Sequence, residues 1–286
     1  MRFILVSALL LGMAGALWAQ HDEHRQPTGE RGSGRGNGGR GGWTAQPLLL
    51  LERGDERAST TLRVRGPEVP SVTVFGPAGG EREFQLVDGR AKIQVANTGI
   101  GNYHWLQVRD EKEQHVGVAT TVWYSSLAGP SPRRLLETRH SELEIVPTPL
   151  PREHANYRES EKWRFMVRYE GQALAEQRLL LETENGSRST FVTDAQGVAT
   201  VLFPRDFAGK AGRSGHGPRP RAGFVLSTEH VAGERHFVTT FNTVYGEDVD
   251  RGRSLGWGAA FGVFGMLSAL PLLRRRKRSE NKEQSC

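Results

Sequence analysis

Residues 163–169 read Trp-Arg-Phe-Met-Val-Arg-Tyr, and this stretch decides the fold class. Large apolar side chains occupy every second position, with arginine or methionine between them. Successive side chains of an extended strand point to opposite faces, so a period of two predicts a strand with one buried and one solvated face. The stretch therefore predicts an antiparallel sheet that covers a core on one side.

The same period continues on both sides of this stretch and predicts a domain over residues 140–249. Its other short runs are Glu144 to Pro147, Leu179/Leu181, Phe191, Val198/Thr200/Leu202, Phe224/Leu226 and Phe237 to Tyr245. Residues 193–197, Thr-Asp-Ala-Gln-Gly, predict a hairpin connection between two of them. About seven strands in roughly 105 residues is typical of an immunoglobulin-like sandwich.

Residues 43–139 show the same alternation and predict a first sandwich. Its runs are Leu62/Val64, Val72/Val74, Phe84/Leu86, Ala91/Ile93/Val95, Tyr103 to Val108 and Val116/Val118/Thr120/Val122. Proline and glycine pairs separate them as turns. The predicted fold class is all-β: two tandem immunoglobulin-like antiparallel β-sandwich domains plus a single C-terminal transmembrane helix.

The N-terminal segment resembles an export signal rather than part of a fold. Residues 1–20 combine a basic start at Arg2, an apolar run and an ending rich in small residues, which predicts a cleavable signal peptide. The alternative is an uncleaved membrane anchor. Residues 21–42 hold eight glycines between Gly29 and Gly42, so we expect a flexible tether.

The C-terminal segment predicts a single membrane span. Residues 255–273 form a stretch of 19 residues without a charge, and as a helix they reach about 28 Å, close to the ~30 Å of bilayer hydrocarbon. Five consecutive cations begin the tail, residues 274–286. Basic residues stay on the cytoplasmic side, so the sandwiches are expected outside and the tail inside.

Composition excludes several other classes of protein. The formal net charge is +6, but the excess lies in the tail, the tether and Arg2, so a nucleic-acid-binding domain is not indicated. The only cysteine is Cys286, which excludes disulfide frameworks and thiolate chemistry in the folded part. Exported sandwiches without disulfides favour a bacterial periplasm, with the anchor in the inner membrane. No common nucleophile, phosphate-loop or metalloprotease motif occurs, so we do not expect an enzyme.

Four stretches carry a resemblance to a known family: residues 141–154 (SELEIVPTPLPREH), YEGQALAEQRLLLET, TDAQGVATVLFP, and FVLSTEH at residues 224–230. Over residues 43–247 the chain resembles periplasmic accessory proteins of bacterial nickel and cobalt transporters, a family with an immunoglobulin-like domain of unknown function. The resemblance implies an exported location, two such layers and a link to metal uptake. The chain departs from the family in its glycine tether, which separates His21 from the first strand.

Histidines are the candidate metal ligands, because nickel and cobalt accept imidazole nitrogens and the exported part offers no thiolate. His21 and His24 form the densest cluster, with two carboxylates between them. His154, His216 and His230 are candidates for a second cluster, together with His236, if a long loop at residues 207–223 folds over that end of the sandwich. The alternative is that all of these are ordinary surface histidines. No other cofactor is expected.

These patterns lead to two functional hypotheses. The first is a membrane-anchored periplasmic accessory protein of a nickel or cobalt uptake system, which captures the ion through histidines beside an integral-membrane transporter. The alternative is a structural or protein-interaction module of the cell envelope without a metal. Sandwich folds host many functions, so the fold does not choose between them.

Overall fold

The structure is a computed structural model that describes residues 42–54, 56, 58–95, 102–152, 156–207, 219–248 and 259–268. The described part is mostly β-strand, which confirms the prediction of a mostly β protein. The strands are β1 (Leu48–Arg53), β2 (Ser59–Arg65), β3 (Ser71–Phe75), β4 (Glu81–Gln85), β5 (Arg90–Gln94), β6 (Tyr103–Lys112), β7 (His115–Tyr124), β8 (Leu143–Pro147), β9 (Tyr157–Arg158), β10 (Lys162–Tyr169), β11 (Gln172–Ala173), β12 (Arg178–Thr183), β13 (Arg188–Val192), β14 (Val198–Leu202), β15 (Arg221–Ala232) and β16 (Arg235–Gly246).

The first sandwich packs the sheet β1-β2-β5 against the four strands β4-β3-β6-β7. All of its strand pairings are antiparallel. Burial alternates along β3 and β5, as the period of two predicts, with Val72, Val74, Ala91 and Ile93 facing the core. The core joins inward side chains from both sheets into one apolar cluster.

The second sandwich is built in the same way. Its smaller sheet places β10 between β8 and β14, with β11 along the end of β10, and its larger sheet has the order β13-β12-β15-β16. The stretch that decided the fold class is β10, where Phe165 and Val167 are fully buried and Arg164 is exposed. The alternation therefore reports which face of the strand covers the core.

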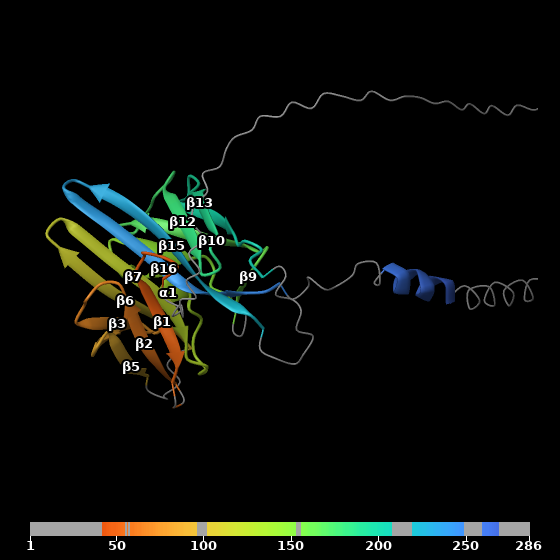
Figure 1. The fold of residues 1–286 in the computed structure, drawn as a ribbon, viewed down its shortest axis with the longest axis horizontal. Coiled ribbons are helices and arrows are strands. Elements are labelled where there is room, and N and C mark those ends of the chain that lie inside the picture. The colour runs from red at the N-terminus through yellow and green to blue at the C-terminus, as the bar shows by residue number, and fades with distance from the viewer. Residues whose placement is uncertain are drawn as a thin grey trace, which may run out of the picture. The chain divides into compact units, whose positions relative to one another are not determined.

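The two sandwiches share one sheet. β7 of the first and β16 of the second pair in parallel, with a register that runs from His115 opposite His236 to Thr120 opposite Phe241. We call this pairing the seam. It joins the two larger sheets into a single nine-stranded sheet that includes β9 (Figure 1). A continuous hydrogen-bonded sheet holds the sandwiches more rigidly than a flexible linker does.

Polar side chains reinforce the seam. The hydroxyls of Thr120 and Thr121 donate to the carbonyls of Thr240 and Asn242, at 2.8 Å and 2.7 Å. The Asn242 amide also bonds both backbone groups of Leu49 in β1, accepting from the N–H at 2.8 Å and donating to the carbonyl at 2.9 Å. These groups are buried, so each bond removes an unsatisfied donor or acceptor.

The prediction of a hairpin at residues 193–197 is wrong. This turn connects β13 and β14, which lie in different sheets of the second sandwich, so the chain crosses from one sheet to the other there. The Asp194 carboxylate still caps the turn, accepting from the N–H groups of Gln196 and Val198 at 2.9 Å each. Turn residues report where the chain reverses, but they do not report which strand it pairs with afterwards.

Two helices complete the described chain. α1 (Arg133–Glu137) lies between the last strand of the first sandwich and the first strand of the second, with Leu135 buried. Residues 259–268 form a second helix, which falls inside the predicted span at 255–273. Within the described residues, no helix has both the length and the apolar character needed to cross a membrane. The predicted signal peptide, the cytoplasmic tail and all of the tether before Gly42 lie outside the described residues.

Candidate metal centre

Of the five predicted metal ligands, the structure describes His230 alone. His21, His24, His154 and His216 lie outside the described residues. His230 is half-buried on β15, and its ring packs against Tyr169 with centroids 4.6 Å apart. Tyr169 in turn contacts Phe237. Among the described residues, His230 thus belongs to an aromatic cluster rather than to a group of ligands.

The structure does not bring His230 and His236 together. In the β15–β16 hairpin, His230 lies opposite Phe237, and His236 lies opposite Val231. Residues directly opposite each other share a face, and neighbours along a strand do not. His230 and His236 therefore lie on opposite faces of the sheet, so these two histidines do not converge as the sequence suggested.

His236 is instead paired with a histidine from the other sandwich. His115 opens β7 and His236 is the second residue of β16, and they occupy the first register position of the seam. Their Nδ1 atoms lie 3.2 Å apart, and their ring centroids are 5.0 Å apart. The other ring nitrogen of His236, Nε2, lies 3.3 Å from the Glu229 carboxylate. We call His115, His236 and Glu229 the seam cluster.

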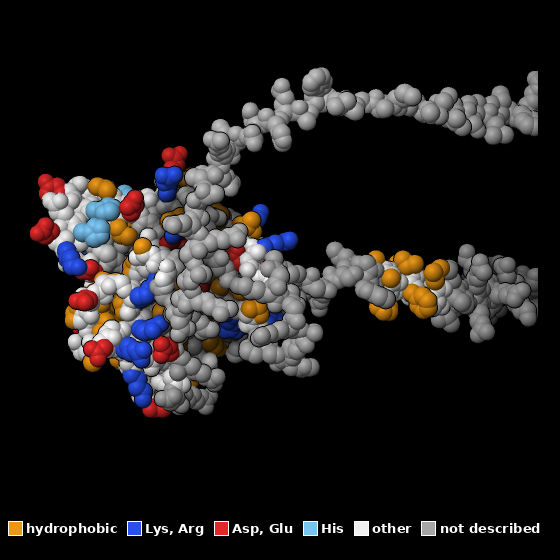
Figure 2. All heavy atoms as spheres, viewed as in Figure 1, with side chains coloured by type: hydrophobic (Ala, Val, Ile, Leu, Met, Phe, Trp, Pro, Cys, Tyr) orange, Lys and Arg blue, Asp and Glu red, His pale blue; other side chains and the backbone are white. Residues whose placement is uncertain are grey.

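The seam cluster lies on the surface. His115 is exposed, and the side chains of His236 and Glu229 are 38% and 74% exposed. Figure 2 shows histidine side chains gathered on the visible face, with acidic side chains near them. An ion or a partner in solution can therefore reach these rings without opening the fold.

The charged groups beside the seam cluster are mostly paired with one another. Arg235 bonds Glu111, and Glu111 also accepts from Arg109 at 2.8 Å. These bonds hold the pKa of Glu111 below its usual value, mainly through the hydrogen bond from Arg109. The backbone N–H of His236 donates to the Gln114 carbonyl at 2.7 Å, which fixes the hairpin end beside β7. Among the described residues, the acidic group with an ion-pair contact to the histidine pair is Glu229, which contacts His236.

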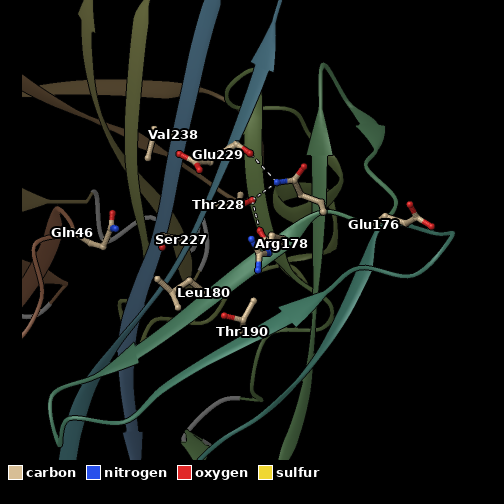
Figure 3. A pocket seen from close by; sticks show the side chains of 10 residues that line it. Gln46, Glu176, Arg178, Leu180, Thr190, Ser227, Thr228, Glu229 and Val238 are labelled. Carbon is tan, nitrogen blue, oxygen red and sulfur yellow. Dashed lines mark hydrogen bonds between the residues drawn. The ribbon is translucent and has the colours of Figure 1, made fainter.

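A groove of about 600 Å³ adjoins the seam cluster through Glu229 (Figure 3). Its walls come from β12, β13, β15, β16 and the segment before β1, and it is lined by Gln46, Glu176, Gln177, Arg178, Leu180, Thr190, Ser227, Thr228, Glu229 and Val238. The Gln177 amide spans part of it, donating to the Thr228 hydroxyl and to the Glu229 carbonyl at 2.8 Å each. The lining mixes polar and apolar groups.

The other two described histidines lie away from this surface, His104 buried and His140 half-buried. His104 is 4% exposed and packs against Trp123, and burial, with a smaller effect of Arg82, lowers its pKa to about 4. His140 lies between α1 and β8 and stacks on Trp105. Burial lowers its pKa as well.

No group of three or more histidine, cysteine, aspartate or glutamate side chains in the described chain is arranged to hold a metal ion. The seam cluster offers two ring nitrogens on one side and a carboxylate on the far nitrogen of one ring. Each histidine follows a tight turn in the same local pattern, Glu113-Gln114-His115 and Glu234-Arg235-His236. The two histidines share this Glu-x-His pattern, but the pattern does not indicate that their strands pair.

Comparisons with known proteins return structures but no family. No family model matches the chain, and no curated protein matches it. The chain is similar to a solved structure concerning host cell surface retention of a 1.5-MDa bacterial ice-binding adhesin, at 13% identity and a TM-score of 0.24. That similarity covers 72% of this chain and 65%, less than two thirds, of the other. It is also similar to a segment of two fibronectin type III domains from chicken tenascin, at 11% identity and a TM-score of 0.23, covering 69% of this chain and 96% of the segment.

Proposed function

We propose that this chain is a non-enzymatic accessory protein of a transition-metal uptake system, for nickel or cobalt, anchored in the bacterial inner membrane with both sandwiches in the periplasm. It captures the ion through histidines and presents it to an integral-membrane transporter. In this proposal each sandwich is immunoglobulin-like, residues 1–20 are removed as a signal peptide, and residues 255–273 cross the membrane.

The observation that carries the proposal is the exposed histidine pair of the seam cluster. Imidazole nitrogens are ligands that nickel and cobalt accept, and the two Nδ1 atoms are 3.2 Å apart on a surface that solvent reaches. Paired strands of one sheet carry both histidines, so their backbones are set at this separation before an ion arrives. Preorganised ligands lose little conformational entropy on binding.

The helix at residues 259–268 supports anchoring. Every described side chain in it is exposed, including Phe261, Phe264 and Met266, which are 70%, 73% and 76% exposed. A helix that is apolar all round needs an apolar environment, and a bilayer provides one. Tethering a capture site beside a transporter raises the local ion concentration that the transporter meets.

The groove beside Glu229 favours a second candidate function, a protein-interaction module of the cell envelope. A rigid pair of sandwiches with a partly polar groove on its larger sheet fits the binding of a partner chain without any metal. Under this alternative, the histidine pair binds no metal ion.

Nickel accumulation in the producing bacterium tests the proposal. We expect cells that lack the chain to accumulate less nickel or cobalt at low external concentration, and the full chain to restore accumulation. A chain that ends at residue 250 is the matched control, because it keeps both sandwiches and lacks the anchor. Equal accumulation with and without the chain would rule out the uptake role and favour the interaction module.

A further inference from the structure

We infer that His115 and His236 together bind one divalent ion of the nickel, copper, zinc and cobalt class across the seam, and that the bound ion clamps the two sandwiches at this end. The inference rests on the proposed metal capture and deepens it, because it names the ligands, the ion class and a mechanical effect of loading.

The separation of the two nitrogens fits a shared ion. With metal–nitrogen distances of about 2.1 Å, two ligands in adjacent positions lie roughly 3.0 Å apart at a right angle and roughly 3.4 Å apart at the tetrahedral angle. The observed Nδ1···Nδ1 distance of 3.2 Å lies between these values. The backbone thus already sets the separation that chelation requires, and the exposed rings need only turn toward a common point.

Glu229 favours the tautomer that binding requires. Nε2 of His236 lies 3.3 Å from the Glu229 carboxylate, and the negative charge there favours the tautomer with its hydrogen on Nε2, which leaves Nδ1 of the same ring with its lone pair. Carboxylates in this position orient metal-bound histidines and raise their basicity in many proteins. Without the ion, the Nδ1–H of His115 donates to Nδ1 of His236. When the ion binds, this hydrogen moves through solvent to Nε2 of His115, so the neutral ring keeps its one hydrogen.

The ligand set determines the class of ion. Two imidazoles suit nickel, copper, zinc and cobalt, whereas magnesium and calcium prefer oxygen ligands. Two protein ligands leave the remaining coordination positions of the ion to water. Ligands on a partner protein can replace these waters, so the ion can be passed on. This agrees with the described chain containing no group of three ligands around one point.

The position of the pair explains the clamp. His115 belongs to the first sandwich and His236 to the second, and they form the terminal register pair of the seam. The hydrogen bonds at the end of a strand pairing open more readily than those in its middle. An ion held by both rings binds the closed seam only, so it suppresses opening by the factor 1 + [ion]/Kd.

Histidine footprinting tests the site in the full-length chain, purified in detergent without a polyhistidine tag. Nickel chloride is the probe, and diethyl pyrocarbonate modification read by mass spectrometry reports each imidazole. We expect nickel to protect His115 and His236, with His230 as the internal reference that stays reactive. Nickel that protects other histidines but leaves this pair reactive would overturn the inference, while the proposed uptake function would stand.

Amide hydrogen exchange tests the clamp on the same sample. At an ion concentration tenfold above Kd, we expect exchange in residues 116–120 and 237–241 to slow by about tenfold, and exchange in β2 (Ser59–Arg65) to stay unchanged. Protection of both rings without slower exchange in the seam would overturn the clamp and leave the site. Magnesium chloride is expected to change neither readout.

Matched variants complete the test. His115→Asn and His236→Asn are expected to remove the protection and the slower exchange, and Glu229→Gln to weaken nickel binding by about tenfold. Lys162→Asn introduces the same residue on an exposed strand position of another sheet and is expected to change nothing. Circular dichroism checks that each variant is folded. Full nickel protection of His236 in the folded His115→Asn variant would show that the two rings do not share an ion, and would overturn the inference.

Discussion

The two sandwiches have the same arrangement of sheets, but different kinds of side chain make up their cores. The cluster of the second is rich in packed aromatic rings, and that of the first is mainly aliphatic. The rings of the second are Tyr157, Phe165, Phe203, Phe207, Phe224, Phe237, Phe241 and Tyr245. Their buried polar groups differ too, since the second holds the ion pair Arg168–Glu144 and the first holds His104. One architecture therefore tolerates two compositions, and the compositions predict different responses to mutation and pH.

The largest effect is expected from Phe165→Ala in the second sandwich. Phe165 is fully buried and its ring lies 5.8 Å from Tyr157 and 5.9 Å from Phe241. Removing the ring leaves a cavity among side chains that cannot collapse into it, so we expect a loss of about 3 to 5 kcal/mol in the free energy of unfolding, measured by urea denaturation. A loss below about 1 kcal/mol would show that the aromatic cluster is loosely packed.

Arg168→Ala is expected to cost almost as much, about 3 kcal/mol. The Arg168 guanidinium donates to Glu144 at 2.6 Å and to the carbonyls of Glu137 and Thr138 at 3.2 Å and 2.6 Å. The substitution removes the counter-charge of a buried carboxylate and one donor from each of two carbonyls, while the backbone N–H groups of His140 and Ser141 still donate to Glu144. Arg168→Lys is the control. It is expected to recover only part of the lost stability, because an ammonium group cannot reproduce the hydrogen bonds of the planar guanidinium. Full stability of Arg168→Ala would contradict a structural role for the pair.

Acid sensitivity is expected to come from the first sandwich. The pKa of His104 is about 4 in the folded chain, below the 6.5 of a free histidine. Between these values the unfolded chain binds the proton and the folded chain does not, so stability falls as pH drops from about 6.5 to about 4, by about 2 to 3 kcal/mol. Thermal unfolding of wild type and His104→Gln across this range measures the effect.

The His104→Gln variant is expected to lose less stability on acidification than wild type. Burial also lowers the pKa of His140, so part of the acid sensitivity remains in the variant. If wild type and His104→Gln showed the same pH dependence of stability, groups other than His104 would cause the acid sensitivity.

The smallest effect is expected from Ile93→Val in the aliphatic core. Ile93 is fully buried, and the substitution removes one methyl group, so we expect a loss of about 1 kcal/mol, measured by urea denaturation. Together with Phe165→Ala, it compares the two cores under one method. A cost as large as that of Phe165→Ala would show that the first core is the more tightly packed of the two.

The sequence was most informative where one face of a strand is buried. The alternation of Trp163 to Tyr169, and that of Val72 with Val74, placed β10 and β3 correctly, because burial imposes a period of two on the residues themselves. It missed β1, whose run Leu48 to Leu51 is apolar at every position, and short runs of that kind fit a helix as well as a strand.

The candidate site could not be predicted in the same way. His115 and His236 are 121 residues apart, and they meet only because β7 and β16 pair in parallel. Periodicity reports the environment of a strand, not its neighbour. The sequence therefore grouped His236 with His230, its neighbour along the chain, and the alternation of the hairpin separates those two.

The order in which the strands are made has a consequence for production of the protein. β16, which covers the outer edge of β7, is synthesised about 120 residues after it. Until β16 arrives, the first sandwich has an open strand edge. Exposed edges recruit other chains. A fragment that ends before β16 is therefore expected to aggregate, so production of the first sandwich by itself needs this edge to be covered or charged.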